Sequence, residues 1–211
     1  MNIYPIQTVR KKNKKYTFVH PTKCGGCAVE DFLNENYSCY FSTEGHYNKC
    51  KYDNDSIIIV RDPVDRFKSM YKYWKYGSER HQINEEHIEN FKDVNIKTFI
   101  SMIKERSNNL ITEFTQDIHY KPITHWINTT YNNIIILKYN KDLNNTVQKM
   151  ISKMNIPNKV NKLVKHTNIS KSTEEIVLDN DDLLFIKKYF ISDYHLIYLI
   201  NKHPKMFRGV F

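Results

Sequence analysis

Residues 16–36 read YTFVHPTKCGGCAVEDFLNEN, which is a β-prone run followed by two glycines and an amphipathic stretch. Residues 16–20 predict a short strand, and residues 28–36 place apolar side chains on one face of a predicted helix. Gly25 and Gly26 lie between them, in a tight turn. A strand, a glycine-bearing turn and a helix in this order indicate an α/β fold whose turn can hold an anion.

Two further apolar runs extend this pattern along the chain. Residues 56–60 (SIIIV) and 133–138 (NIIILK) are continuous, as in strands buried on both faces of a parallel sheet. Residues 37–42 are another candidate strand. The remaining periodic segments predict helices over residues 64–74, 96–104, 143–154, 181–189 and 194–202. The sequence therefore predicts a three-layer, P-loop-like α/β fold with a central, mainly parallel sheet flanked by helices.

Length and charge narrow the classes of protein. The 211 residues fit a single domain, 1–211, with residues 1–15 as a basic N-terminal arm. The formal net charge of +9 favours anionic partners such as nucleic acid, phosphorylated cofactors or acidic glycans. No apolar run is long enough to span a bilayer, and the first residues lack the apolar core of a signal peptide. We expect a cytoplasmic protein, or a Golgi enzyme if the chain is trimmed from a longer one.

The turn at residues 22–28, TKCGGCA, is the first candidate binding site. Backbone N–H groups converge where a strand turns into a helix, and the helix N-terminus adds positive potential. Lys23 adds a mobile point charge just before the glycines. The turn lacks the Walker spacing and its Gly-Lys-Ser/Thr ending, which disfavours a P-loop kinase.

The cysteines of this turn suggest two rival readings. Cys24 and Cys27 form a Cys-x-x-Cys motif after a strand, as in thioredoxin-like redox proteins. With Cys39 and Cys50 they could instead form a zinc site, although the second pair lacks the short spacing of zinc ligands. The simplest alternative is that both cysteines only fill the turn, and we predict no metal.

The second candidate site follows the apolar run at residues 56–60. Residues 60–71 read VRDPVDRFKSMY, so Arg61 emerges at the carboxyl end of a predicted strand, where open α/β sheets bind ligands. Ser69 lies about two helical turns further along. A guanidinium and a hydroxyl can bind a phosphate together. The alternative is a capped helix with a surface ion pair from Asp62 or Asp65 to Arg66.

Together, these two segments resemble the sulfotransferases that use 3′-phosphoadenosine 5′-phosphosulfate (PAPS), in particular the carbohydrate branch with the heparan and chondroitin enzymes. Residues 22–28 look like the 5′-phosphosulfate loop of that family, and Arg61–Ser69 looks like its 3′-phosphate motif. Cys24, Cys27 and Ala28 replace hydroxyl residues that are usual in the loop. Weaker similarities follow in the family's order: Gly45-His46, Asp117, His119, Tyr120, Pro122, His166 to Ser170, and Asp193-Tyr194.

The resemblance implies a role for each matched residue in binding PAPS or its product PAP. Lys23 would stabilise charge on the leaving phosphate, and the loop amides would hold the 5′-phosphate. Arg61 and Ser69 would bind the 3′-phosphate. The cofactor-binding set is Lys23, Cys24, Gly25, Gly26, Cys27, Ala28, Arg61, Ser69, Asn168, Ser170 and Lys171, the last three from a basic loop that would fold over the nucleotide.

The acceptor would be a hydroxyl-bearing molecule, and an acidic glycan suits both the resemblance and the charge. Its hydroxyl must lose a proton, which a histidine can accept near neutral pH. His46 is the first candidate base and His119 the second, with Glu30 and Glu44 as alternatives. Two other classes stay open: a basic nucleic-acid-binding module, although no such motif appears, and a sulfotransferase-like fold that binds without catalysis.

Overall fold

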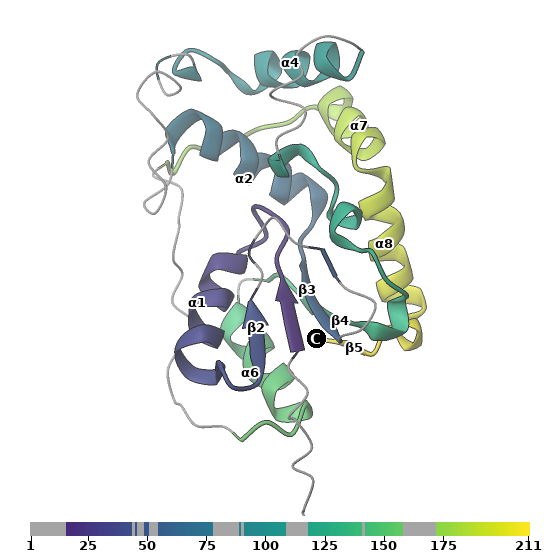
Figure 1. Cartoon of the computed structure of the whole chain (residues 1–211). Helices are drawn as coiled ribbons and strands as arrows, with labels where there is room; N and C mark the ends of the chain where they lie inside the picture. The colour runs from purple at the N-terminus through teal and green to yellow at the C-terminus, as the bar shows by residue number, and fades with distance from the viewer. Residues whose placement is uncertain are drawn as a thin grey trace, which may run out of the picture.

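The computed structural model describes residues 16–43, 45, 49–50, 55–77, 89, 91–108, 118–140, 142–157 and 172–211 (Figure 1). Several predictions concern residues outside these ranges. They are the basic arm at residues 1–15, the candidate bases Glu44 and His46, the motif residue Asp117, and the basic loop with His166, Asn168, Ser170 and Lys171.

A five-stranded parallel sheet forms the centre of the fold. Its strands are β1 (Tyr16–Val19), β2 (Phe41–Thr43), β3 (Ser56–Val60), β4 (Ile134–Lys138) and β5 (Gly209–Val210). Their order is β2-β1-β3-β4-β5, and every neighbouring pair is parallel. The sheet confirms the predicted α/β class. Because all strands run the same way, the loops after β1, β3 and β4 meet at one edge.

Two strands differ from the sequence-based prediction. The segment at residues 37–42 gives a strand only from Phe41, because Tyr37 ends helix α1 and is fully buried in the core. Strand β5 was not predicted at all. It has two residues and no apolar run, and it exists because it pairs with β4 through Ile135 and Ile136.

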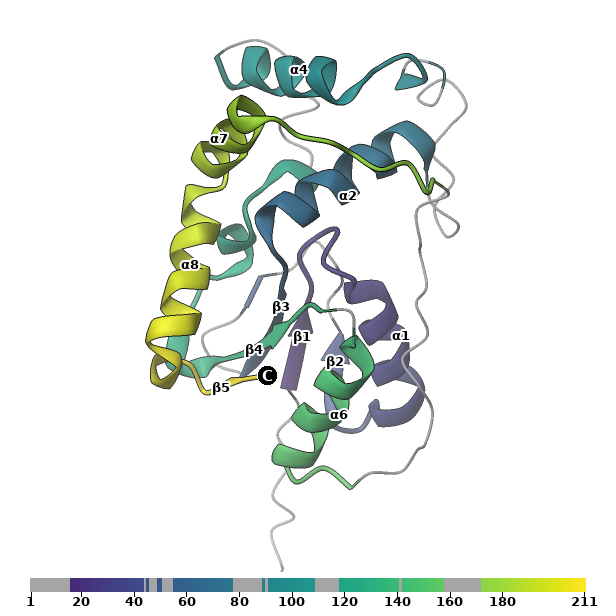
Figure 2. The same cartoon turned by 180° about the vertical axis from the view of Figure 1, so that it is seen from behind.

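Helices surround the sheet on several sides. Their bounds are α1 (Gly26–Tyr37), α2 (Pro63–Tyr76), α4 (Ile96–Asn108), α6 (Leu143–Lys153), α7 (Asn180–Tyr189) and α8 (Ile191–Lys202). In both views α1 and α6 lie to one side of the strands and α8 to the other, while α2, α4 and α7 lie beyond the carboxyl ends of the strands (Figures 1 and 2). No helix in the described ranges has the length and apolarity needed to cross a membrane.

The beginning of α2 explains how the second motif is fixed in place. The carboxylate of Asp62 accepts hydrogen bonds from the backbone N–H groups of Val64 (2.9 Å) and Asp65 (3.0 Å), and Pro63 occupies the first turn. This is an N-cap with proline inside the helix start. It leaves Arg61 at the end of β3, directly before the helix.

The buried side chains form two clusters. The larger one packs the sheet against α1, α6 and α8, with Phe18, Ile58 and Ile136 at its centre. The smaller one joins α2, α4 and α7 through Phe67, Phe99 and other side chains. The loops at the carboxyl edge of the sheet lie between these clusters, so both clusters position the candidate site (Figures 1 and 2).

Candidate active site

The turn after β1 has an unusual backbone that suits anion binding. Lys23 has φ 62° and Gly25 has φ 75°, so two left-handed residues flank Cys24. Lysine adopts this conformation rarely, and strain of this kind concentrates at functional sites. Helix α1 then begins at Gly26, so its unpaired N–H groups and positive end face the turn. We call residues 22–28 the phosphate loop below.

Close packing explains both glycines of the phosphate loop. A Cβ atom on Gly25 would lie 2.6 Å from Cε2 of Tyr139, and one on Gly26 would lie 2.1 Å from Cβ of His20. Both distances are far shorter than real carbon contacts. The side chains of Tyr139 and His20 therefore pack directly against the loop backbone, which restricts the conformation of the loop.

Arg61 joins the second motif to the phosphate loop. Its Nη1 donates to the carbonyl oxygen of Lys23 at 3.0 Å, and its guanidinium lies 4.4 Å from the centre of the Tyr139 ring. Its Nε is buried and has no hydrogen-bond partner among the described residues. A buried donor without a partner is costly, and an anionic ligand would satisfy it. Arg61 therefore has the donor capacity that a phosphate site needs.

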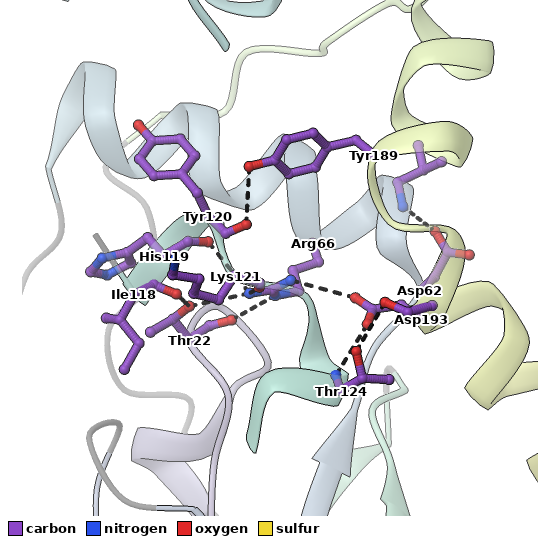
Figure 3. A network of polar contacts seen from close by, with 12 residues as sticks. Thr22, Asp62, Arg66, Ile118, His119, Tyr120, Lys121, Thr124, Tyr189 and Asp193 are labelled. Atoms are coloured by element: carbon purple, nitrogen blue, oxygen red, sulfur yellow. Dashed lines mark hydrogen bonds and ion pairs between the residues drawn. The ribbon is translucent and has the colours of Figure 1, made fainter. Parts of the chain in front are cut away.

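Arg66 is the largest correction to the sequence analysis. It forms no surface ion pair with Asp62 or Asp65, since its side chain is only 1% exposed. Instead, Nε donates to the carbonyl oxygen of Thr22 at 2.9 Å, and Nη2 donates to that of Lys121 at 2.7 Å (Figure 3). A guanidinium suits this position because its donors point in fixed directions.

The charge of Arg66 is balanced by a carboxylate from helix α8. Oδ2 of Asp193 lies 3.7 Å from Nη1 of Arg66, and Asp193 is fully buried (Figure 3). Oδ1 of Asp193 accepts a hydrogen bond from the backbone N–H of Thr124 at 3.2 Å. Burial raises the pKa of Asp193, while Arg66 lowers it. The pair therefore connects the phosphate loop, the segment at 118–124 and α8.

Lys23 lies in a largely dry environment next to aromatic rings. Its Nζ is 4.3 Å from the centre of the Tyr73 ring, and the His119 ring stacks on Tyr73 at 4.9 Å with an interplanar angle of 16°. The pKa of Lys23 is lowered from 10.5 to about 8, mainly by burial and also by the nearby Arg61, against the opposing effect of Cys27. This ammonium gives up its proton far more easily than an ordinary lysine.

Ser69 belongs to the same face of α2 as these groups. Arg66, Ser69 and Tyr73 are spaced by three and then four residues, so they share one side of the helix. Arg66 and Tyr73 both contact the phosphate loop or its lysine. This spacing puts the half-buried Ser69 between them on the face that is directed toward the loop.

Glu30, an alternative base, is already engaged by another residue. Its Oε2 lies 2.8 Å from Nε2 of His20, which is 1% exposed and directly follows β1. The contact joins α1 to the residue between β1 and the phosphate loop. A carboxylate held in this way supports the loop, which makes Glu30 a poorer candidate base than a free side chain.

The rival readings of the cysteines gain no support. Cys24 is fully buried, and desolvation raises its pKa from 9.0 to about 11, the opposite of a reactive redox thiol. All four cysteines are described, and no disulfide joins them. In the described part of the chain, no three His, Cys, Asp or Glu side chains gather where they could hold a metal ion.

The geometry brings Lys23, Arg61 and His119 together at the carboxyl edge of the sheet, with Ser69 on the adjoining helix face. The buried contacts of Arg66 were not predicted from the sequence. No role was predicted for Tyr73 or Tyr139. For Tyr73 a signal existed, because it lies four residues after Ser69 on the same helix face. For Tyr139 the signal was weaker: it directly follows the predicted strand at 133–138, and residues at strand ends often line sites in α/β folds.

Fold and site together define an α/β protein with a glycine-bearing turn after its first strand and an arginine directly after the neighbouring strand, both of which suit the binding of anions. A sequence model of the sulfotransferase family matches residues 11–197, which is most of the chain. The chain belongs to the sulfotransferase family and is a transferase of sulfuryl groups. No curated protein and no solved structure gave a significant match.

Proposed function

We propose that this sulfotransferase takes its sulfuryl group from PAPS and transfers it to a hydroxyl group of an acidic carbohydrate. The observation that carries the proposal is the buried Nε of Arg61, which lacks a partner among the described residues beside a loop built for anions. A donor with two separate phosphate groups needs two such sites. The phosphate loop and the Arg61–Ser69 segment follow two adjacent strands, β1 and β3.

Each phosphate has a distinct set of ligands in this proposal. The backbone N–H groups of residues 25–28, at the start of α1, would hold the 5′-phosphate. The guanidinium of Arg61 and the hydroxyl of Ser69 would hold the 3′-phosphate, which distinguishes PAPS from plain adenine nucleotides. Cys27 and Ala28 offer amides but no hydroxyl, so binding at the loop would depend on the backbone.

Sulfuryl transfer, like phosphoryl transfer, depends on positioning and charge stabilisation more than on covalent catalysis. PAPS, when bound, supplies the activated group. Lys23 is the residue for the charge that builds up on the leaving phosphate, because its ammonium lies at the loop in a largely dry environment where such interactions are strong. Because the pKa of Lys23 is about 8, small changes in the groups around it alter the fraction of the side chain that is charged at neutral pH.

The acceptor hydroxyl must lose its proton to a base. Two contacts support His119 as this base: its ring stacks on Tyr73, which also contacts Lys23, and its backbone carbonyl accepts from Nη2 of Arg66 at 3.4 Å. His46, outside the described residues, stays a predicted base from the resemblance. Either imidazole could take the proton near neutral pH.

An acidic carbohydrate as acceptor is supported by two observations. The chain carries a net charge of +9, which attracts anionic polymers at long range. The Arg61–Ser69 segment also resembles the branch of the family that acts on heparan and chondroitin chains. An uncharged phenol or lipid would not be attracted by this net positive charge.

The decisive experiment is a calorimetric titration with PAP, the desulfated product. We expect PAP to bind more tightly than ADP, and Arg61→Ala to abolish the preference. Lys205→Ala is the matched control, since it removes one positive charge from an exposed residue near β5, at the other end of the sheet. A folded protein that does not bind PAP would overturn the proposal. If PAP binds, labelled PAPS with acidic polysaccharides and with simple phenols tests the acceptor class.

A further inference from the structure

Tyr73 contacts two groups that the proposed function uses. The ammonium of Lys23 lies over its ring, with Nζ 4.3 Å from the ring centre. The imidazole of His119 stacks on the same tyrosine ring, with ring centres 4.9 Å apart and an interplanar angle of 16°. Lys23 comes from the phosphate loop, Tyr73 from α2 and His119 from the 3₁₀ turn at Ile118–Tyr120. One ring therefore links three separate segments of the site.

The Tyr73 ring is held by its own surroundings. It makes an edge contact with Trp74, with ring centres 5.6 Å apart, and Trp74 in turn stacks on Tyr120 at 5.9 Å and 9°. Trp74 and Tyr120 are both buried. The helix that carries Tyr73 is fixed at its start by the Asp62 cap and by Arg66. The ring cannot turn away from Lys23 without disturbing this packing.

A ring in this position acts on the charge of the lysine. An ammonium is attracted by the face of an aromatic ring, and more strongly when water is excluded. The other groups around Lys23 act in both directions: the guanidinium of Arg61 disfavours its charge, whereas Cys27 and Cys24 favour it. Since burial already brings the pKa of Lys23 close to 8, a modest loss of attraction would leave much of it neutral at physiological pH.

We propose that Tyr73 is a positioning residue for the sulfuryl-transfer site, which keeps the Lys23 side chain charged over the phosphate loop and aligned with His119. This inference rests on the proposed function, because it assigns Tyr73 a role through Lys23 and none in contact with the substrate. Neither the family match nor the sequence motifs assign a role to this residue.

The test distinguishes the effect of the aromatic ring of Tyr73 from the effects of its size and of its hydroxyl group. Tyr73→Phe keeps the ring, while Tyr73→Leu and Tyr73→Met keep an apolar side chain over the loop but remove the ring. The full chain is labelled with ¹³C,¹⁵N-lysine, the Lys23 signal is assigned with Lys23→Arg, and its pKa is measured by NMR titration. We expect Tyr73→Phe to match the wild type, and both aliphatic variants to lower the pKa by about 0.5 or more.

A second readout follows PAP affinity with pH. In the wild type the affinity should fall as pH rises through about 8, because Lys23 then loses its charge. The midpoint of this fall should move to lower pH in Tyr73→Leu and stay in Tyr73→Phe. An unchanged Lys23 pKa in both aliphatic variants would overturn the role of Tyr73. Absence of PAP binding in every protein would instead overturn the proposed function, while the NMR titration would still decide the role of Tyr73.

Discussion

Nε of Arg66 donates a hydrogen bond to the carbonyl oxygen of Thr22 at 2.9 Å, so the first turn of α2 is joined to the residue just before Lys23. The same guanidinium donates to the carbonyl oxygen of Lys121 at 2.7 Å (Figure 3). One buried side chain therefore sets the distance between the phosphate loop and the segment that carries His119. The arrangement of the proposed site residues Lys23 and His119 therefore depends on a side chain that is almost completely buried.

Replacing Arg66 tests this dependence. We expect Arg66→Ala to lower the free energy of unfolding by about 3–5 kcal/mol, because it leaves the carboxylate of Asp193 buried without a counter-charge. Urea denaturation measures the loss. The exposed ion pair of Lys92 with Glu89 provides the control, since Lys92→Ala should cost no more than about 1 kcal/mol. Equal costs for the two variants would mean that the buried network adds nothing to stability.

Lys23 should reduce the stability of the folded protein at neutral pH. Its pKa is about 8 in the folded state against 10.5 ordinarily, so the folded state resists protonation and the cost is fully present below pH 8. The cost then fades as pH rises from about 8 to 10.5. We expect Lys23→Met to be more stable than the wild type by about 1–3 kcal/mol at pH 7.

The pH dependence distinguishes this effect from a simple gain in packing. Between pH 7 and pH 9.5 the advantage of Lys23→Met over the wild type should shrink, as measured by urea denaturation at each pH. Lys23→Arg keeps its charge throughout, so its stability relative to the wild type should fall over the same range. A constant difference for both variants would show that the charge of Lys23 costs nothing. Both variants share the left-handed backbone strain, which therefore cancels.

The sequence predicted the elements that depend on local pattern. Strand β3 coincides with the apolar run at residues 56–60, because a strand buried on both faces needs apolar side chains throughout. The turn between β1 and α1 was predicted from its two glycines. Strand β5 was missed because its two residues carry no pattern and are held only by pairing with β4.

Arg66 shows why the rest of the site could not be predicted. In the sequence it lies beside Asp62 and Asp65, which makes a local ion pair the natural expectation. Its actual partners Thr22 and Lys121 are 44 and 55 residues away along the chain. Only the fold brings these carbonyl groups to one point, and no local spacing encodes that.

The four cysteines should react with a thiol reagent in a fixed order. Cys39 is exposed and should be modified first by N-ethylmaleimide at pH 7.5. Cys24 and Cys50 are buried, with pKa values raised by desolvation to about 11, so their thiolate fraction is about 100-fold lower than normal. They should react only on unfolding, as mass spectrometry of the modified peptides can check. Rapid modification of Cys24 would contradict the buried loop.

Cys27 should report on the phosphate site. It is half-buried in the first turn of α1, within the phosphate loop. We expect its modification to be slowed by PAP but not by ADP at the same concentration, while Cys39 is unaffected by either. Protection of both cysteines to the same degree would indicate a general tightening of the fold, in place of a ligand at the loop.

Gly25 should tolerate no side chain, because a Cβ would clash with Tyr139. Comparison with Gly45 separates this clash from the cost of the left-handed backbone. Gly25→Ala carries two costs: a left-handed backbone at φ 75° and a Cβ only 2.6 Å from the Tyr139 ring. Gly45 shares the backbone condition, at φ 61°, but no atom of the described residues lies within 4 Å of its added Cβ. Gly45→Ala should therefore cost about 1 kcal/mol of stability, and Gly25→Ala more than about 2 kcal/mol. Adding Tyr139→Leu to Gly25→Ala removes the clash and should recover the excess but not the backbone cost. If the double variant is no more stable than Gly25→Ala, the close approach of Tyr139 does not explain the glycine.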